Sequence, residues 1–224
     1  MSTDLSSEIG NNHFRERLLK YTRLAYRCLP KMKKPQILDV GCGSGVSTIE
    51  LAKLSDGEIV GIDIDQSLLD RLNRKIAEEC LSNRVKAVKC SLFEIDFPDE
   101  SFDIIWAEGS IWIIDFEKGL KEWRRLLKPN GLLVVHDEIK TISNRIEKIP
   151  SYGYKLINYF MLPEDAYWTE YYGPLEIRIK ELYVKYKNDS DTLKILRKQQ
   201  NEMDMVKRNP EEHISAFYII QRLG

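Results

Sequence analysis

The chain has 224 residues, of which 43% are hydrophobic and 31% charged, as expected of one soluble α/β domain with a sizeable core. Its 34 basic and 35 acidic residues leave a net charge of -1, so no overall charge draws it to nucleic acid or to an anionic membrane. The cysteines form no C-x-x-C pair, the first twelve residues are polar, and no apolar run could span a bilayer. These features predict a cytoplasmic protein with reduced thiols.

The N-terminal part predicts a mobile start followed by a helix. Residues 1–11 are rich in Ser, Asp and Asn, and an apolar stripe then indicates a helix over 13–29, ended by Pro30. The stripe consists of Phe14, Leu18, Tyr21, Leu24, Ala25 and Cys28. We expect this helix either to cover a binding site, with His13, Phe14 and Arg17 nearby, or to pack on the edge of a sheet.

The chain is organised around a buried strand, 36–40, that runs into a glycine-rich turn and then a helix over 46–54. Gly41, Gly43 and Gly45 let the backbone approach a ligand closely, and the helix N-terminus directs unpaired N–H groups at the turn. The next strand, 58–62, ends at Asp63, whose carboxylate can accept hydrogen bonds from both hydroxyls of a ribose.

The details of the turn indicate which nucleotide fits. A dinucleotide site has the pattern Gly-x-Gly-x-x-Gly, whereas this chain has Gly-x-Gly-x-Gly, with Val46 at the position of the third dinucleotide glycine. Asp39 precedes the turn by two residues and would repel a pyrophosphate. The pattern therefore favours a cationic nucleoside without phosphates, such as S-adenosylmethionine.

Two segments resemble the motifs of class I S-adenosylmethionine-dependent methyltransferases. Leu38 to Gly45 is similar to the first motif, and Val60 to Asp63 is similar to the second. The segments Pro98–Asp103 and Leu127–Gly131 are also similar to the family, in its small-molecule branch of the methyltransferase type 11 kind. The resemblance implies S-adenosyl-L-methionine as cofactor and S-adenosyl-L-homocysteine as product.

The resemblance also assigns the adenine to the loop after the third strand, 84–89, which follows a helix of residues 66–80 capped by Asp65 or Ser67. The family has an acidic residue early in this loop, whereas this chain has Ser91, with Glu94 and Asp96 as alternatives. The residues expected to bind the cofactor are Asp39, Gly41, Cys42, Gly43, Gly45, Asp63, Ile64, Ser91, Leu92, Phe93 and Glu108.

Glu108 follows the fourth strand, 104–107, at the edge where parallel sheets bind their ligands. It could hold an amine substrate, take a proton or contact the methionine end of the cofactor, and the structural alternative is that it caps the next helix. Trp112 is expected to form part of the pocket wall.

His136 ends the fifth strand, 132–136, which follows a helix of residues 116–127. It could act as a base or contact the acceptor, or it could be a hydrogen-bonded structural histidine. Asp137 and Glu138 could hold a divalent metal, as in methyltransferases that act on catechols, but no third ligand is evident and we expect no metal.

The resemblance implies a doubly wound, mostly parallel seven-stranded sheet of order 3-2-1-4-5-7-6, with strand 7 antiparallel and helices on both faces. The last two strands fall at 154–162 and 214–221, after a helix at 142–151. We expect a single domain comprising an N-terminal helical arm (1–34), a core (35–162), a lid of two helices (163–212) and a final strand (213–224).

The lid begins with an aromatic and acidic stretch. Trp168, Tyr171 and Tyr172 could form a pocket for an amine or shield a sulfonium, because aromatic faces attract cations, or they could simply pack the lid.

The sequence thus predicts methyl transfer to a small molecule by in-line displacement, in a monomer or homodimer, with Glu108 and His136 as candidate catalytic residues. The alternatives are an RNA or protein methyltransferase and a regulatory protein that binds the cofactor without turnover. No Asn-Pro-Pro-Tyr-type string follows the fourth strand, and no basic domain is appended, which argues against nucleic acid.

Overall fold

A computed structural model describes residues 5–138 and 142–224. Its contacts divide the described chain into two compact units. The sheet unit comprises residues 21–138, 142–161 and 215–224, and the helical unit comprises residues 5–20 and 162–214.

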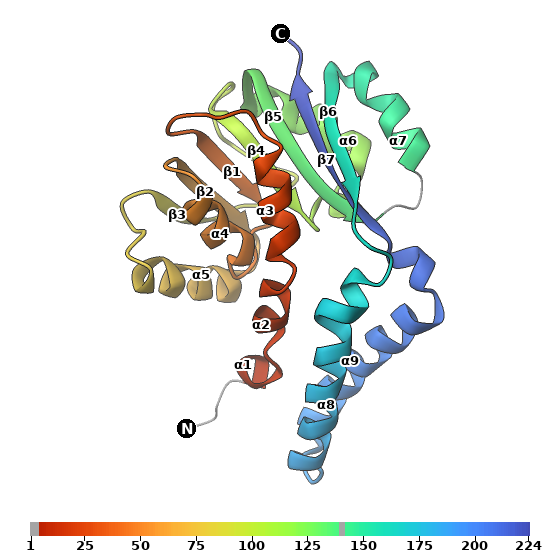
Figure 1. The fold of residues 1–224 in the computed structure, drawn as a ribbon. Helices are drawn as coiled ribbons and strands as arrows, with labels where there is room; N and C mark the ends of the chain where they lie inside the picture. The colour runs from red at the N-terminus through yellow and green to blue at the C-terminus, as the bar shows by residue number, and fades with distance from the viewer. Residues whose placement is uncertain (1–4, 139–141) are drawn as a thin grey trace. The chain divides into compact units, whose positions relative to one another are not determined.

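The sheet unit is built on seven strands in the order β3-β2-β1-β4-β5-β7-β6, as Figure 1 shows. Five strands are parallel, and β7 is antiparallel to both β5 and β6. The strands are β1 (Gln36–Val40), β2 (Glu58–Asp63), β3 (Val85–Lys89), β4 (Phe102–Glu108), β5 (Leu127–Glu138), β6 (Tyr154–Met161) and β7 (Ser215–Arg222). The predicted fold class and strand order are confirmed.

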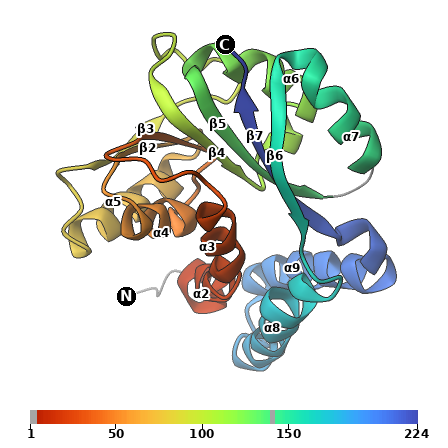
Figure 2. The same cartoon turned by 45° about the horizontal axis from the view of Figure 1, so that its top comes forward.

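Helices cover both faces of this sheet (Figures 1 and 2). On one face lie α4 (Val46–Leu54) and α5 (Gln66–Glu78), and on the other lies α6 (Phe116–Trp123), followed in the chain by α7 (Ile142–Lys148). The central strands are apolar on both sides because each face is covered, as in other parallel sheets. The largest core cluster lies on the α6 face, where Phe116, Leu120 and Trp123 pack against strand residues such as Leu38 and Ile105.

Local capping fixes where these helices begin. Asp65 accepts a hydrogen bond from the Ser67 amide at 2.8 Å and so caps α5, as one of the two predicted alternatives has it. Asp115 caps α6 in the same way, through the Glu117 amide at 2.9 Å.

The predicted helix of residues 13–29 is wrong in extent and in register. The structure has two helices, α2 (Asn11–Glu16) and α3 (Leu19–Arg27), and the buried positions of α3 are Leu19, Thr22 and Ala25. Leu24, which the apolar stripe predicts to be buried, is 43% exposed. The physical reason is a hydrogen bond, because the Thr22 hydroxyl donates to Glu108 at the end of β4. The helix is therefore rotated so that Thr22 faces the sheet and Leu24 faces outward.

The helical unit is a packed assembly of short N-terminal helices and a long hairpin. Its elements are α1 (Leu5–Ile9), α2, a π-helical turn (Trp168–Tyr172), α8 (Gly173–Lys185) and α9 (Ser190–Arg208). Its buried core contains Ile9, Tyr171, Leu175, Ile179, Leu182, Leu196 and Met203. The two predicted lid helices are present, whereas their role as a lid over the ligand edge stays a prediction.

Of the part of the chain that the structure describes, no helix has the length and apolar character that crossing a bilayer requires.

A buried carboxylate joins α8 to α9. Glu176 is 8% exposed and contacts Lys207 at 2.6 Å and Lys180 at 3.2 Å, and it accepts a hydrogen bond from Gln200 at 3.2 Å. These contacts, the bond from Lys207 foremost, lower the pKa of Glu176 to about 2.

We expect Glu176→Gln to lower the free energy of unfolding at pH 7 by about 1–3 kcal/mol, because the ammonium of Lys207 loses its partner. A carboxyl whose pKa falls on folding stabilises the fold above its unfolded pKa of 4.5, and that stability is lost as the pH falls toward 2. The deficit should therefore shrink in urea denaturation series run from pH 7 down to pH 3. Glu181→Gln, an exposed acid on the same helix, is the control and should change little.

Candidate cofactor site

The glycine turn after β1 has the conformation that its sequence predicts. Gly41, Gly43 and Gly45 have φ values of 73°, 52° and 79°, which side chains rarely tolerate. A Cβ on Gly41 would lie 2.5 Å from the Ser110 Cβ, and one on Gly45 would lie 2.2 Å from a Leu72 methyl. These two glycines therefore serve packing as well as turn geometry.

Gly43 differs from them, since a Cβ there would meet no described atom within 4 Å. Its amide donates to Asp63 Oδ2 at 2.9 Å, and the Asp65 amide donates to Asp63 Oδ1 at 2.9 Å. The Asp63 carboxylate is thus fixed beside the open side of the turn, and each of its oxygens retains a lone pair. This is the arrangement that a ribose would need.

Asp39 lies beneath the turn and is 1% exposed. The Thr48 hydroxyl on α4 donates to its Oδ2 at 2.6 Å. Burial raises the pKa of Asp39 to about 7, and the nearby carboxylates of Glu108 and Asp63 add to the rise, against the bond from Thr48. A ligand cation would relieve this repulsion, whereas a phosphate would increase it.

Glu108 ends β4 and is held by two donors. The Thr22 hydroxyl of α3 donates to its carboxylate at 3.0 Å, and the Trp106 indole donates at 2.9 Å. Thr22 and Trp106 are both fully buried. Because an indole N–H only donates, the bonded oxygen of Glu108 acts as an acceptor. The geometry suits a carboxylate that faces a cation better than one that delivers a proton.

Apolar side chains follow the carboxyl ends of β2 and β3. Ile64, just after Asp63, is 68% exposed, and Phe93 is 58% exposed with Lys118 Nζ 5.1 Å from its ring centroid. Leu92 is half-buried against the core, and the Ser91 hydroxyl accepts a bond from the Phe93 amide at 3.3 Å. The loop has apolar surface for an adenine, while a polar contact from Ser91 to it stays a prediction.

Cys42 takes part through its backbone. Its amide donates to the Ile62 carbonyl at 2.9 Å, while its side chain is buried and desolvation raises the pKa of the thiol. Trp112 is 67% exposed and donates to the Gly109 carbonyl at 3.0 Å, so its predicted place in a pocket wall stays a prediction.

His136 lies deeper than a base in contact with substrate would. It is 5% exposed, its Nε2 is 3.0 Å from the Ser215 hydroxyl, and its ring stacks on Phe217 at 4.5 Å. Burial lowers the pKa of His136 to about 4, so the ring is neutral at pH 7. These observations favour the structural alternative, and a direct role in catalysis or acceptor binding stays a prediction. Among residues 5–138 and 142–224, no cluster of three His, Cys, Asp or Glu suits a metal ion.

The aromatic residues predicted on the acceptor side belong to the helical unit. Tyr171 is 6% exposed in the core of that unit, and the Tyr172 hydroxyl donates to Glu202 at 3.1 Å. Lys207 Nζ lies 4.9 Å from the centroid of the Trp168 ring. Packing accounts for Tyr171, and a substrate role for all three residues stays a prediction.

Sequence reasoning missed three supporting residues. Trp106 was recognisable, because residues two apart on a strand share a face and Trp106 precedes Glu108 by two. Thr48 had a weaker signal as a hydroxyl in the first turn of the helix after the glycines. Thr22 had none, since a polar residue inside an amphipathic pattern reads as exposed.

We expect Asp39→Asn to raise the free energy of unfolding above pH 7 by about 1–4 kcal/mol. The folded protein holds a proton on Asp39 up to about pH 7, whereas the unfolded chain releases it near 3.8, so wild-type stability falls as the pH rises through this window. The neutral amide has no such dependence. The gain should vanish near pH 4 in denaturant titrations, while Glu58→Gln, an exposed acid of the same unit, should show no gain.

Comparisons with known proteins agree with this geometry. Residues 37–131 match the family model described as a methyltransferase domain. Sterol 24-C-methyltransferase of Aspergillus fumigatus is 36% identical over 107 residues, which are 47% of this chain and 28% of that protein. The matches span 28% to 52% of the lengths of the first curated relatives, about half or less.

Solved structures show the same fold. The [4+2]-cyclase SpnF has a TM-score of 0.77 at 19% identity, over 92% of this chain and 82% of that one. A methyltransferase of Thiobacillus denitrificans, solved with S-adenosyl-L-homocysteine, has a TM-score of 0.76 at 15% identity, over 92% and 91%. Residues 37–131 are thus similar to a methyltransferase domain, and the strand order of the sheet agrees with the methyltransferase fold of these solved structures.

Proposed function

We propose that the protein binds S-adenosyl-L-methionine at the glycine turn and transfers its methyl group to a small-molecule acceptor. The observation that carries the proposal is the acidic setting of the turn, where burial and then the nearby carboxylates of Glu108 and Asp63 raise the pKa of Asp39. A ligand with a ribose and two cationic centres matches this set of groups.

Each part of the ligand would have its own partner. Asp63, fixed by two amides, would accept hydrogen bonds from the ribose hydroxyls. Asp39 and Glu108 would attract the cationic methionine end. Ile64 and Phe93 offer exposed apolar surface to the adenine.

The cofactor, when bound, supplies a methyl group already activated on a sulfonium, so the reaction is an in-line displacement. The protein's residues then have three tasks, which are to position donor and acceptor, to exclude water and to stabilise positive charge. Glu108 is suited to the last task, because Thr22 and Trp106 fix it as a hydrogen-bond acceptor. No residue has to be a strong base if the acceptor arrives with a free lone pair.

Two observations support a small molecule over RNA as acceptor. The chain has a net charge of -1, which offers no general attraction to phosphates. The name of the sterol methyltransferase relative describes a small-molecule acceptor for that protein. Since a protein of the same fold is named as a [4+2]-cyclase, cofactor binding and methyl transfer are tested separately below.

We expect S-adenosyl-L-homocysteine to bind with a dissociation constant of about 1–100 μM in titration calorimetry, and Asp63→Ala to weaken it at least about tenfold by removing the ribose acceptor. Glu58→Gln, on the same strand, should bind normally. Absence of binding, or an Asp63→Ala variant that binds like wild type, would contradict the proposal.

If the product binds, labelled S-adenosyl-L-methionine should transfer its methyl group to members of a panel of amines, phenols, carboxylates and sterols, read by mass spectrometry. Transfer to RNA or to protein instead would replace the small-molecule assignment. Binding with no transfer to any of these classes would indicate a protein that binds the cofactor without turnover.

We expect Thr22→Val to weaken S-adenosyl-L-methionine more than S-adenosyl-L-homocysteine, by about three- to tenfold. Loss of the hydroxyl frees Glu108 to turn away from the cation that only the methylated form carries on sulfur. Thr22→Ser keeps the hydroxyl and should restore the preference. Equal loss for both ligands would indicate that Thr22 serves only to pack α3.

A further inference from the structure

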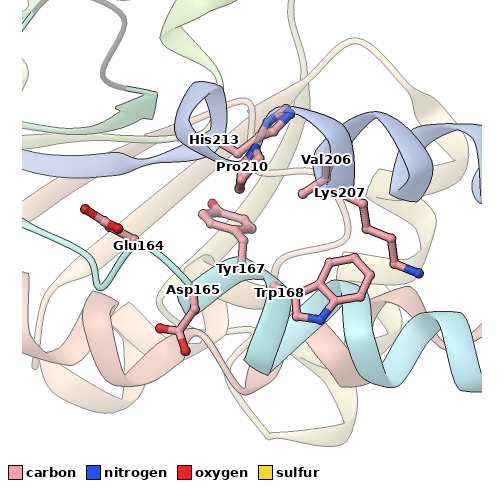
Figure 3. Close-up of a pocket in the computed structure, with 8 residues that line it drawn as sticks. All are labelled: Glu164, Asp165, Tyr167, Trp168, Val206, Lys207, Pro210 and His213. Atoms are coloured by element: carbon pink, nitrogen blue, oxygen red, sulfur yellow. The ribbon is translucent and has the colours of Figure 1, made fainter.

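We propose that the helical unit has a second ligand site, which binds an organic ammonium ion with an aromatic or aliphatic body. The site is a pocket of about 480 Å³ built from two stretches of this unit, 164–168 and 206–213 (Figure 3). Its size lies in the range of small-molecule sites. The proposal involves residues of the helical unit only and so does not depend on cofactor binding.

The walls of the pocket are largely apolar. Tyr167 and Trp168 contribute their rings from the segment after β6, and Val206 and Pro210 face them from the end of α9 and the turn beyond it. Figure 3 shows the Tyr167 ring directed toward Pro210 and His213. Rings and aliphatic groups on opposite walls would hold a flat or compact apolar body between them.

The uncompensated charge of the lining is negative. Glu164 and Asp165 are exposed at the pocket, and neither forms an ion pair with a residue that the structure describes; the Thr169 hydroxyl donates to Asp165 Oδ2 at 3.1 Å. Lys207, the cation of the lining, is engaged by Glu176 at 2.6 Å. An anionic ligand would therefore meet two carboxylates and a lysine that is already paired.

The Trp168 ring already contacts a cation within the protein. The Lys207 ammonium lies 4.9 Å from the centroid of its ring, which is a cation–π contact made within the protein. The pocket thus combines aromatic faces, apolar walls and two carboxylates, the same elements by which proteins recognise amines. A neutral ligand would gain the apolar contacts but no electrostatic attraction to the carboxylates or the aromatic rings.

Three probes with one body and different head groups test the proposal: 3-phenylpropylamine, 3-phenylpropan-1-ol and 3-phenylpropionate. Titrated into the full chain at pH 7 and low salt, the amine should bind about tenfold more tightly than the alcohol, and the carboxylate should bind least. Added salt should reduce the advantage of the amine, because the two carboxylates are exposed.

Variants locate the site. Glu164→Gln combined with Asp165→Asn should reduce the affinity for the amine to that for the alcohol, whereas Tyr167→Leu should weaken both probes. Asp191→Asn, a solvent-exposed acid of the same unit, should bind like wild type. Circular dichroism would confirm that each variant is folded.

Asp63→Ala separates this proposal from the cofactor site. Amine binding should be unchanged in that variant, even if S-adenosyl-L-homocysteine no longer binds. Three results would overturn the proposal. They are equal binding of the three probes, unchanged amine affinity in the variant that combines Glu164→Gln with Asp165→Asn, and loss of amine binding in Asp63→Ala.

Discussion

The constraint on which the sheet unit depends is the convergence of three carboxylates at the ends of parallel strands. Asp39 is the penultimate residue of β1, and Asp63 and Glu108 are the last residues of β2 and β4; adjacent parallel strands present these ends at one edge of the sheet. Burial raises the pKa of Asp39, the most buried of the three, and the repulsion from Glu108 and Asp63 adds to the rise. Such a cluster persists only if donors hold each member, and the structure supplies a different donor set for each: a hydroxyl on α4, two amides at the turn, and a hydroxyl with an indole for Glu108.

These donors lie at different distances along the chain from the carboxylates that they hold. Local sequence patterns therefore predicted some parts of the site and not others. The glycine turn, Asp39 and Asp63 lie within one β-α-β unit, so spacing alone relates them. The strand order followed from resemblance to a known fold, and the apolar runs of β4 and β5 suit central strands. The support of Glu108 by Thr22 joins residues 86 apart in sequence, and no local pattern encodes that distance.

The error in the N-terminal helix has the same origin. An apolar stripe through Leu24 predicts a helix packed by hydrophobic contact, whereas in the structure the buried Thr22 donates a partly buried hydrogen bond to the Glu108 carboxylate and Leu24 faces outward. Holding a partly buried carboxylate outweighs the burial of one leucine, because an unsatisfied polar group costs more than an exposed side chain of that kind. Tyr171 shows a related limit: its position in an aromatic stretch was visible, whereas its direction, into the core of the helical unit, was not.

The two acidic regions of the protein differ in how their charge is managed, and this difference separates their chemistry. At the sheet edge Asp39 is buried, Asp63 and Glu108 are half-buried, and neutral donors hold all three side chains in place for a ligand that is itself cationic. In the helical unit Glu176 is neutralised by Lys207 and serves stability, while Glu164 and Asp165 stay exposed beside Tyr167 and Trp168. Buried, preorganised charge gives strong and specific recognition, whereas exposed charge on an apolar pocket gives selection by class that weakens with salt. The first arrangement suits a single invariant cofactor, and the second suits ligands that share a head group and vary in body.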